Sequence, residues 1–132
     1  MPMTPKKNCL TARKLYEHFR PSIDTIFLRG NALFVKTKNR FQKQFISEIL
    51  WIQADNIYID MHTIDGVYTL SMSIARFEEQ VSSSDLVRIN RSQLVNVARI
   101  DSFEPHRAFI GEMEFKITDK FKPSFYSSFQ LL

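Results

Sequence analysis

The sequence of 132 residues has one cysteine, three glycines and three histidines, and these scarcities exclude several classes of protein. Cys9 has no partner in the sequence, which excludes a disulfide framework and a cysteine-ligated zinc site and favours a reducing compartment. No run approaches the roughly eighteen apolar residues that a membrane span needs, and the first ten residues lack the apolar core of a signal peptide. We therefore expect a cytoplasmic protein without membrane contact.

Groups of residues that indicate catalysis or a bound cofactor are also missing from the sequence. It has no Ser/His/Asp or Cys/His grouping, no glycine-rich phosphate loop and no nucleotide-binding fingerprint. Asp60 and His62 are two residues apart on a predicted strand, but no third metal ligand occurs at a suitable spacing. Glu78 and Glu79 are adjacent on a predicted helix, where they point apart and form a poor acid/base pair. We predict that the protein is not an enzyme and uses no metal or other cofactor.

Positive charge is concentrated in the first third of the chain. The formal net charge is +4, but residues 1–45 contain ten of the eighteen Lys and Arg and only two acids, Glu17 and Asp24. The remainder of the chain is consequently net negative. A basic segment attracts polyanions, although a solvated charged face is the ordinary reason for such an excess.

The pattern of residue types from Thr25 onward predicts a mainly β protein. Short runs rich in Val, Ile, Phe, Tyr and Thr are separated by turn pairs that begin at positions 30, 38, 55, 65, 105 and 111. Asp65-Gly66 is the clearest pair, because a two-residue hairpin turn needs positive φ angles that these residues tolerate. The strand before it alternates an apolar face with a polar one, namely Ile57, Ile59 and Met61 against Tyr58, Asp60 and His62.

Three short helical patterns accompany these strands, in residues 11–21, 73–81 and 118–129. Ser73 is placed to cap the second helix, and Pro123 is near the first turn of the third, where proline is tolerated. Each helix has a single apolar stripe. We therefore expect the helices to lie on the sheets as peripheral covers.

The segment RINRSQLVNV, residues 88–97, places polar and cationic side chains between strand-like flanks. Its apolar neighbours predict one strand over 86–89, buried positions at 94, 95 and 97, and the start of another strand at Ile100. Residues 90–93 then form a connection. A tight loop held by buried flanks would project some of its polar side chains toward a partner.

This segment resembles the signature of the LytTR DNA-binding domain, which reads approximately R-[IV]-H-[RK]-S-x-[LIV]-V-N. Three further blocks resemble that family in the same order and spacing: ILWIQADNIYIDMHT, VYTLSMSIARFEEQV and FKITDKFKPSF. The resemblance extends over about residues 33–129. We therefore predict an N-terminal extension with a short helix at 1–32 and a LytTR-like domain at 33–132.

The resemblance implies short antiparallel strands in about three small sheets, with two or three peripheral helices. It also implies that loops, rather than a recognition helix, enter successive major grooves of double-stranded DNA. The corresponding regions here are residues 55–58, 90–92 and 118–122. Arg91 is the first candidate, because a guanidinium can donate twice to guanine O6 and N7 or fork onto a phosphate. Asn90 can pair with adenine N6 and N7 if its side chain faces the groove.

The other candidate DNA-binding residues are Ser92, Asn56 and Tyr58 in the base-reading regions, and Lys120, Lys122 and Arg88 as phosphate ligands. Lys36, Lys38 and Arg40 are weaker phosphate candidates. An ordinary structural role is the alternative to DNA binding for several of these residues. Ser92 and Asn96 are typical of turn caps, Tyr58 of hairpin packing, and Arg88 of an ordinary strand surface.

Two positions depart from the family pattern. Asn90 stands where the family usually has histidine, which keeps hydrogen bonding but removes titration near neutral pH. Thr118-Asp119 replaces Ser-Arg, and an acidic side chain beside a phosphate would repel it. Asp119 can instead cap the final helix, with Lys120 supplying the positive charge.

The resulting hypothesis is a stand-alone, sequence-specific transcriptional regulator that binds repeated half-sites in double-stranded DNA. A homodimer is a further hypothesis, motivated by the amphipathic pattern at 11–21. Two alternatives remain open. One is a protein-interaction module that kept the fold and lost DNA binding, as Asp119 and the negative remainder of the chain would allow. The other is a binder of single-stranded nucleic acid that uses the aromatic residues and the basic first third.

Overall fold

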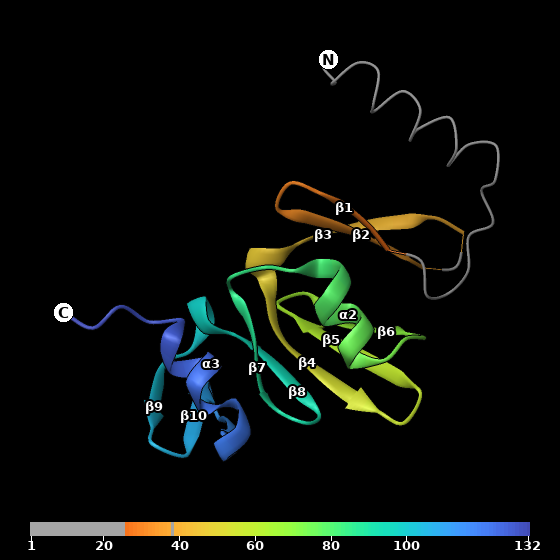
Figure 1. The fold of residues 1–132 in the computed structure, drawn as a ribbon. Helices are drawn as coiled ribbons and strands as arrows, with labels where there is room; N and C mark the ends of the chain where they lie inside the picture. The colour runs from red at the N-terminus through yellow and green to blue at the C-terminus, as the bar shows by residue number, and fades with distance from the viewer. Residues whose placement is uncertain (1–25, 38) are drawn as a thin grey trace.

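A computed structural model describes residues 26–37 and 39–132, which fold into short antiparallel strands with a few short helices (Figure 1). The helix predicted at 11–21, Cys9 and Lys38 lie outside the described residues. Within the described part, the strands form three sheets, two of three strands and one of five. The predicted mainly β fold with three small sheets is confirmed.

The first sheet contains β1 (Ile26–Arg29), β2 (Ala32–Lys36) and β3 (Phe41–Phe45). The five-stranded central sheet has the order β6-β5-β4-β8-β7, with β4 (Ile49–Asp55), β5 (Tyr58–Thr63), β6 (Gly66–Leu70), β7 (Leu86–Asn90) and β8 (Gln93–Asn96). The third sheet contains β9 (Ser102–Glu104), β10 (Arg107–Ile110) and β11 (Met113–Lys116). The helices within residues 26–37 and 39–132 are α2 (Ile74–Val81), α3 (Lys122–Ser127) and three 3₁₀ turns, η1 (Ile46–Glu48), η2 (Val97–Arg99) and η3 (Asp119–Phe121). The predicted boundary at residue 33 falls within the β1–β2 hairpin, and it stays a prediction.

The central sheet is apolar on both faces because successive side chains of a strand point to opposite sides. Ile52 of β4 lies opposite Leu94 of β8, and both join one buried cluster. Their neighbours Trp51 and Val95 join a second cluster. The first cluster is covered by α2 and the first sheet, and the second by the third sheet and α3.

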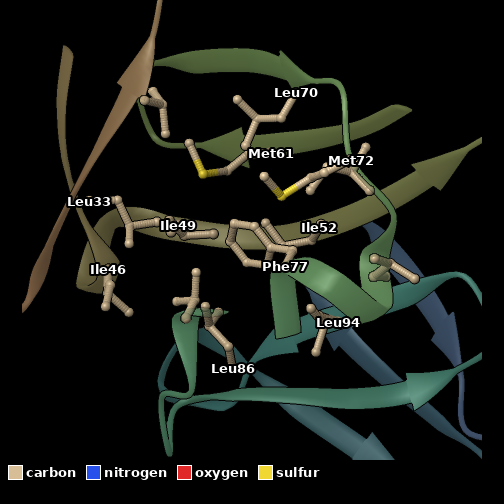
Figure 2. Packing of buried hydrophobic residues seen from close by; sticks show 14 residues of the cluster. Leu33, Ile46, Ile49, Ile52, Met61, Leu70, Met72, Phe77, Leu86 and Leu94 are labelled. Atoms are coloured by element: carbon tan, nitrogen blue, oxygen red, sulfur yellow. The ribbon is translucent and has the colours of Figure 1, made fainter. Parts of the chain in front are cut away.

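Helix α2 forms where the local pattern predicts it. The Ser73 hydroxyl accepts a hydrogen bond from the Arg76 backbone N–H at 3.1 Å, which satisfies one of the free donors at the helix start. Ile74, Phe77 and Val81 are buried along one face. The Phe77 ring lies over β4 beside Ile52 (Figure 2). The predicted cap and apolar stripe are therefore both confirmed.

The second cluster carries the C-terminal part of the chain. Phe125 of α3 is fully buried with Phe115 and Ile117, and Pro123 occupies the first turn of the helix as predicted. Phe129, on the same predicted stripe, stays 37% exposed, with its ring centroid 5.0 Å from that of Phe103. The strand β7 contributes Ile89 to this cluster. The C-terminal segment is thereby packed directly against the strand that precedes residues 90–92.

Three local predictions are wrong, because the turn, the strand residue and the strand start that they name lie a few positions away in the structure. The β5–β6 turn consists of Ile64 and Asp65, while Gly66 already pairs with Thr63 in the ladder. The Thr63 side chain shifts the turn, since its hydroxyl accepts from the Asp65 and Gly66 N–H groups and donates to the Gly66 carbonyl. Ile57 is 63% exposed because it lies in the β4–β5 turn. The strand expected at Ile100 begins at Ser102, because Ile100 ends η2.

His62 packs flat against Trp51, the single tryptophan of the chain, with ring centroids 4.1 Å apart. Partial burial lowers the pKa of His62 below its ordinary value of 6.5, and the nearby Asp60 carboxylate opposes this shift. The unfolded chain therefore binds the proton more readily than the folded one. The stability contributed by neutral His62 is present above pH 6.5 and is lost as the pH falls through the lower folded pKa.

We expect a proton NMR titration of His62 to give a midpoint below 6.5 in the folded protein. His62→Gln should remove that titration. It should also reduce the loss of unfolding free energy as the pH falls below 6.5, because the glutamine side chain does not titrate. A midpoint at or above 6.5 would contradict burial as the dominant influence on this imidazole.

Candidate nucleic-acid interface

Three segments that the sequence singled out lie together at one end of the molecule. They are the β4–β5 turn at 56–57, the β7–β8 turn at 91–92 and the connection at 117–122, called here the three tips. They line the lower edge of the view in Figure 1. The Ala54 N–H donates to the Ser92 carbonyl at 2.7 Å, and the Asn90 side chain donates to the Lys116 carbonyl at 2.8 Å. Direct hydrogen bonds therefore join the central turn and its flanking residue Asn90 to the strands β4 and β11, which lead into the two outer tips.

The β7–β8 turn is narrower than predicted, because Asn90 and Gln93 already pair as strand residues. Asn90 Oδ1 accepts from the Ser92 N–H at 3.0 Å and is 3.2 Å from the Ser92 hydroxyl, which donates to it. Asn90 Nδ2 donates to Gln93 Oε1 and to the Lys116 carbonyl, both at 2.8 Å. An asparagine that bonds the backbone two residues onward stabilises a turn. The Asn90 side chain therefore faces into the protein rather than outward, and it holds Ser92 with it.

A bulge in β7 joins the turn to the C-terminal connection. The ladder register between β7 and β8 shifts between Arg88 and Asn90, which leaves Ile89 without a pairing partner in β8. The Ile89 carbonyl instead accepts from the Thr118 N–H at 3.0 Å. Bulges of this kind redirect a strand and end its pairing. Here the bulge attaches the third tip to the base of the second.

Arg88 is directed into the protein, and only 15% of its side chain is exposed. Its Nε donates to the Asn90 carbonyl at 2.8 Å, and Nη2 donates to the Arg91 carbonyl. Nη1 forms an ion pair with Glu78 Oε1 at 2.9 Å, and the guanidinium carbon lies 5.4 Å from the centroid of the Phe121 ring. This arrangement differs from both sequence interpretations, an exposed strand residue and a phosphate ligand.

Arg91 occupies the outermost position of the β7–β8 turn, and its side chain is exposed. Its backbone carbonyl is bound by Arg88, while its guanidinium has no hydrogen bond or ion pair with any other residue of the described chain. The result is a free cation on a turn whose backbone is bound on both sides of it.

The β4–β5 turn is held by Asn56, which adopts a left-handed conformation with φ of +62°. Asparagine tolerates this region better than most residues because its short polar side chain bonds locally. The Asn56 side chain is exposed, and Tyr58 at the start of β5 is 41% exposed on the face opposite the buried Ile59. Both candidates therefore lie at the same end as Arg91, beside the exposed Asp55.

The third tip contains both positively and negatively charged side chains. Lys120 is exposed, with Nζ 5.5 Å from the centroid of the neighbouring Phe121 ring. Lys122 is only 22% exposed, and its Nζ lies 3.0 Å from Asp119 Oδ1 and 2.6 Å from His106 Nδ1. The hydrogen bond from Lys122, with the attraction of its charge, lowers the pKa of Asp119. The predicted capping by Asp119 is wrong, because its carboxylate turns to Lys122 and neither η3 nor α3 has a side-chain cap.

Lys116 is a residue that sequence reasoning missed. It ends β11 with its side chain exposed, and its carbonyl accepts the Asn90 hydrogen bond. Alternation with the buried Phe115 signals that Lys116 is exposed, but its closeness to Asn90 depends on a contact between distant segments. The weaker candidates Lys36 and Arg40 belong to the first sheet region, at the upper edge of Figure 1 and away from the three tips.

Comparison with known proteins explains this arrangement. The family model described as the LytTr DNA-binding domain matches residues 39–128. The chain belongs to the LytTR DNA-binding domain family. The LytTR fold is also seen in a solved structure, the LytTr DNA-binding domain of a protein described as a methyl-accepting/DNA response regulator from Bacillus cereus. That structure is 16% identical and covers 76% of this chain and 97% of its own, with a TM-score of 0.64. Among curated proteins, none matches significantly.

The LytTR family is a DNA-binding family, and DNA is a polyanion, so the charges on the surface formed by the three tips matter for its function. The surface offers exposed cations at Arg91, Lys116 and Lys120, with Asp55 and Asp119 as exposed anions beside them. Within residues 26–37 and 39–132, no three His, Cys, Asp or Glu side chains are placed to share a metal ion. No helix in the same part of the LytTR chain is long and apolar enough to cross a membrane.

Proposed function

We propose that this LytTR protein is a cytoplasmic, sequence-specific transcriptional regulator that inserts its three tips into major grooves of double-stranded DNA. The observation that carries the proposal is the free Arg91 guanidinium on a turn bound by Asn90 and Arg88. A side chain on a fixed backbone loses less conformational freedom on binding than one on a loose loop. The turn is therefore pre-organised to present one cation to a base edge.

Base reading in this proposal is shared between the first two tips. Arg91 donates to guanine O6 and N7, and such a bidentate contact discriminates by about 1–3 kcal/mol against the wrong base. Asn56 at the β4–β5 turn has the amide that suits adenine N6 and N7, and the exposed Tyr58 offers a hydroxyl and a ring beside it. Asn90 and Ser92 contribute indirectly, because their hydrogen bonds determine the shape of the turn.

Phosphate binding is assigned to the lysines that border the tips. Lys120 and Lys116 are exposed, and each supplies a point charge that neutralises phosphate without reading sequence. Lys122 contributes less, because Asp119 already lies against its Nζ. This internal pairing also reduces the repulsion that Asp119 would exert on DNA, which was the main chemical objection raised by the sequence.

Selection from a random duplex pool, followed by mobility shift, tests the proposed function. The expected result is enrichment of a duplex motif, with two copies per selected fragment if half-sites are bound in pairs. Light scattering on the free protein and on the complex would test the proposed homodimer. Failure to enrich any duplex, combined with stable capture of another protein by the tip surface, would favour the interaction-module alternative. Preference for single strands would favour the remaining one.

Lys120→Gln is expected to weaken binding to all duplexes alike and to reduce the slope of log affinity against log salt by about 1. Lys43→Gln is a matched control, because Lys43 also lies over a nearby aromatic ring, with Nζ 4.9 Å from the Phe45 centroid, but belongs to the first sheet. The change is measured by titration at several salt concentrations. An equal loss in both variants would instead assign phosphate binding to the basic first third of the chain.

A further inference from the structure

We propose that Arg88 and Glu78 form a positioning pair that holds the Arg91 turn in its DNA-reading conformation. This inference rests on the proposed function and deepens it, because it gives Arg88 a role other than phosphate binding and gives a role to Glu78, considered from the sequence only as half of a poor acid/base pair.

The guanidinium of Arg88 bonds two successive carbonyls of the turn. Nε reaches the Asn90 carbonyl at 2.8 Å and Nη2 reaches the Arg91 carbonyl. The Arg91 carbonyl lies within the two-residue turn and has no ladder partner, so another donor must satisfy it or it remains in water. A guanidinium is suited to this task because its donors lie in one rigid plane. Both carbonyls that flank the Arg91 nitrogen and side chain are therefore held by one group.

Glu78 determines the orientation of that group. It accepts from Arg88 Nη1 at 2.9 Å, and it lies on α2 directly after the fully buried Phe77. The helix position is set by core packing, so the carboxylate is anchored although 42% of its side chain is exposed. Phe121 of η3 lies near the guanidinium at 5.4 Å. The pair therefore connects α2 and the third tip to the turn that carries Arg91.

The charge balance separates positioning from phosphate binding. A phosphate ligand would contribute its positive charge to DNA, whereas Glu78 neutralises the charge of Arg88 within the protein. By itself, a carboxylate near the interface opposes DNA binding through Coulomb repulsion. Positioning predicts that removal of either partner weakens binding, although the two substitutions change the net charge in opposite directions.

The test compares Glu78→Ala, Glu78→Gln, Arg88→Ala and the control Glu79→Ala on a duplex selected by the unaltered protein. Glu79 is the exposed neighbour on α2 and makes no ion pair within the described residues. Glu78→Ala and Arg88→Ala should each weaken specific binding roughly five- to thirtyfold, as expected for loss of one or two charge-assisted hydrogen bonds. Glu78→Gln should restore much of the affinity because its amide oxygen can still accept from Nη1.

Four further measurements exclude a general loss of folding and a phosphate role. Thermal unfolding curves should show that all four variants are still folded at the assay temperature. The salt slope should stay unchanged in Arg88→Ala, and the double variant with Glu78→Ala should bind no more weakly than Arg88→Ala alone. Selectivity at the base pair read by Arg91 should fall in Glu78→Ala and stay intact in Glu79→Ala.

Two results would overturn the positioning pair: tighter binding by Glu78→Ala, matching Glu79→Ala, or a salt slope reduced by about 1 in Arg88→Ala. Its failure is distinguishable from failure of the proposed function, which would appear as no duplex motif selected by the unaltered protein. In that case hydrogen exchange decides the inference. The Ser92 amide, which donates to Asn90 Oδ1, should exchange faster in Glu78→Ala than in Glu79→Ala, and equal rates would refute the pair.

Discussion

Arg91→Ala is expected to abolish discrimination at one base pair of the operator and to weaken binding to the selected duplex by about 5- to 150-fold, corresponding to about 1–3 kcal/mol. Binding to unrelated duplexes should fall much less, because there the guanidinium contributes only its charge. The large expected effect follows from the turn. Its backbone is held by Asn90 and Arg88, so truncation removes a contact that costs little ordering on binding.

The measurement is a mobility shift or fluorescence titration with the selected duplex and a set of single-base variants. Arg91→Lys keeps the charge but lacks the planar fork, so it should retain nonspecific binding and lose the base preference. Arg29→Ala is the matched control, because Arg29 is an exposed arginine on β1 of the first sheet, away from the three tips. Equal losses for Arg91→Ala on every duplex would show that Arg91 binds phosphate only.

Asn96→Ala should lower the free energy of unfolding by about 2–4 kcal/mol, the largest stability effect we expect from a polar residue in this domain. Asn96 is completely buried. Its Nδ2 donates to the Ile49 carbonyl at 2.8 Å and to the Ile46 carbonyl at 3.2 Å, and its Oδ1 accepts from the Ala98 N–H at 3.0 Å. Alanine would remove these three hydrogen bonds, although the Ile46 carbonyl would keep its bond from the Ile49 N–H, and would leave a small cavity beside them.

Urea unfolding followed by circular dichroism measures this change, with the dependence on urea concentration expected to stay the same. Asn31→Ala is the control, because the Asn31 side chain is exposed at the β1–β2 turn and its loss should change stability by less than about 0.5 kcal/mol. If Asn96→Ala changed the free energy of unfolding no more than the control Asn31→Ala, the three hydrogen bonds would contribute little net free energy. The interpretation of Asn96 as a turn cap is confirmed, since its side chain accepts from the Ala98 N–H at the start of η2.

Local signals predicted most of the elements because local physics controls them. Ser73 and the apolar stripe of α2 need only neighbours within a few residues, and the alternation at 58–63 needs only the pleat of a strand. The errors also have local causes. Asp65-Gly66 looks like the turn, but the Thr63 hydroxyl moves the turn one residue earlier. The hydrogen bonds of that hydroxyl outweigh the preference of an Asp-Gly pair for the turn positions.

The segments that form the three tips were singled out from the sequence, but the direction of their side chains was not predicted. Asn90 and Ser92 are polar residues at a connection, which favours exposure, yet the Lys116 carbonyl draws the Asn90 amide inward from 26 positions along the chain. Arg88 is turned toward Glu78 in the same way, from ten positions away. These partners come from other elements, so residue type and spacing near 88–92 contain no information about them.

Residue order alone was sufficient for the mainly β class, for the positions of the strands and described helices, and for the segment to which Arg91 belongs, because backbone propensity and alternation act over short distances. Tertiary packing alone left the Arg91 guanidinium without a partner among the described residues and turned the side chains of Asn90, Ser92 and Arg88 toward partners in the protein. The physical reason is that a polar group bonds the nearest suitable partner. Only the folded chain brings Glu78, Lys116 and Ala54 close enough to be that partner.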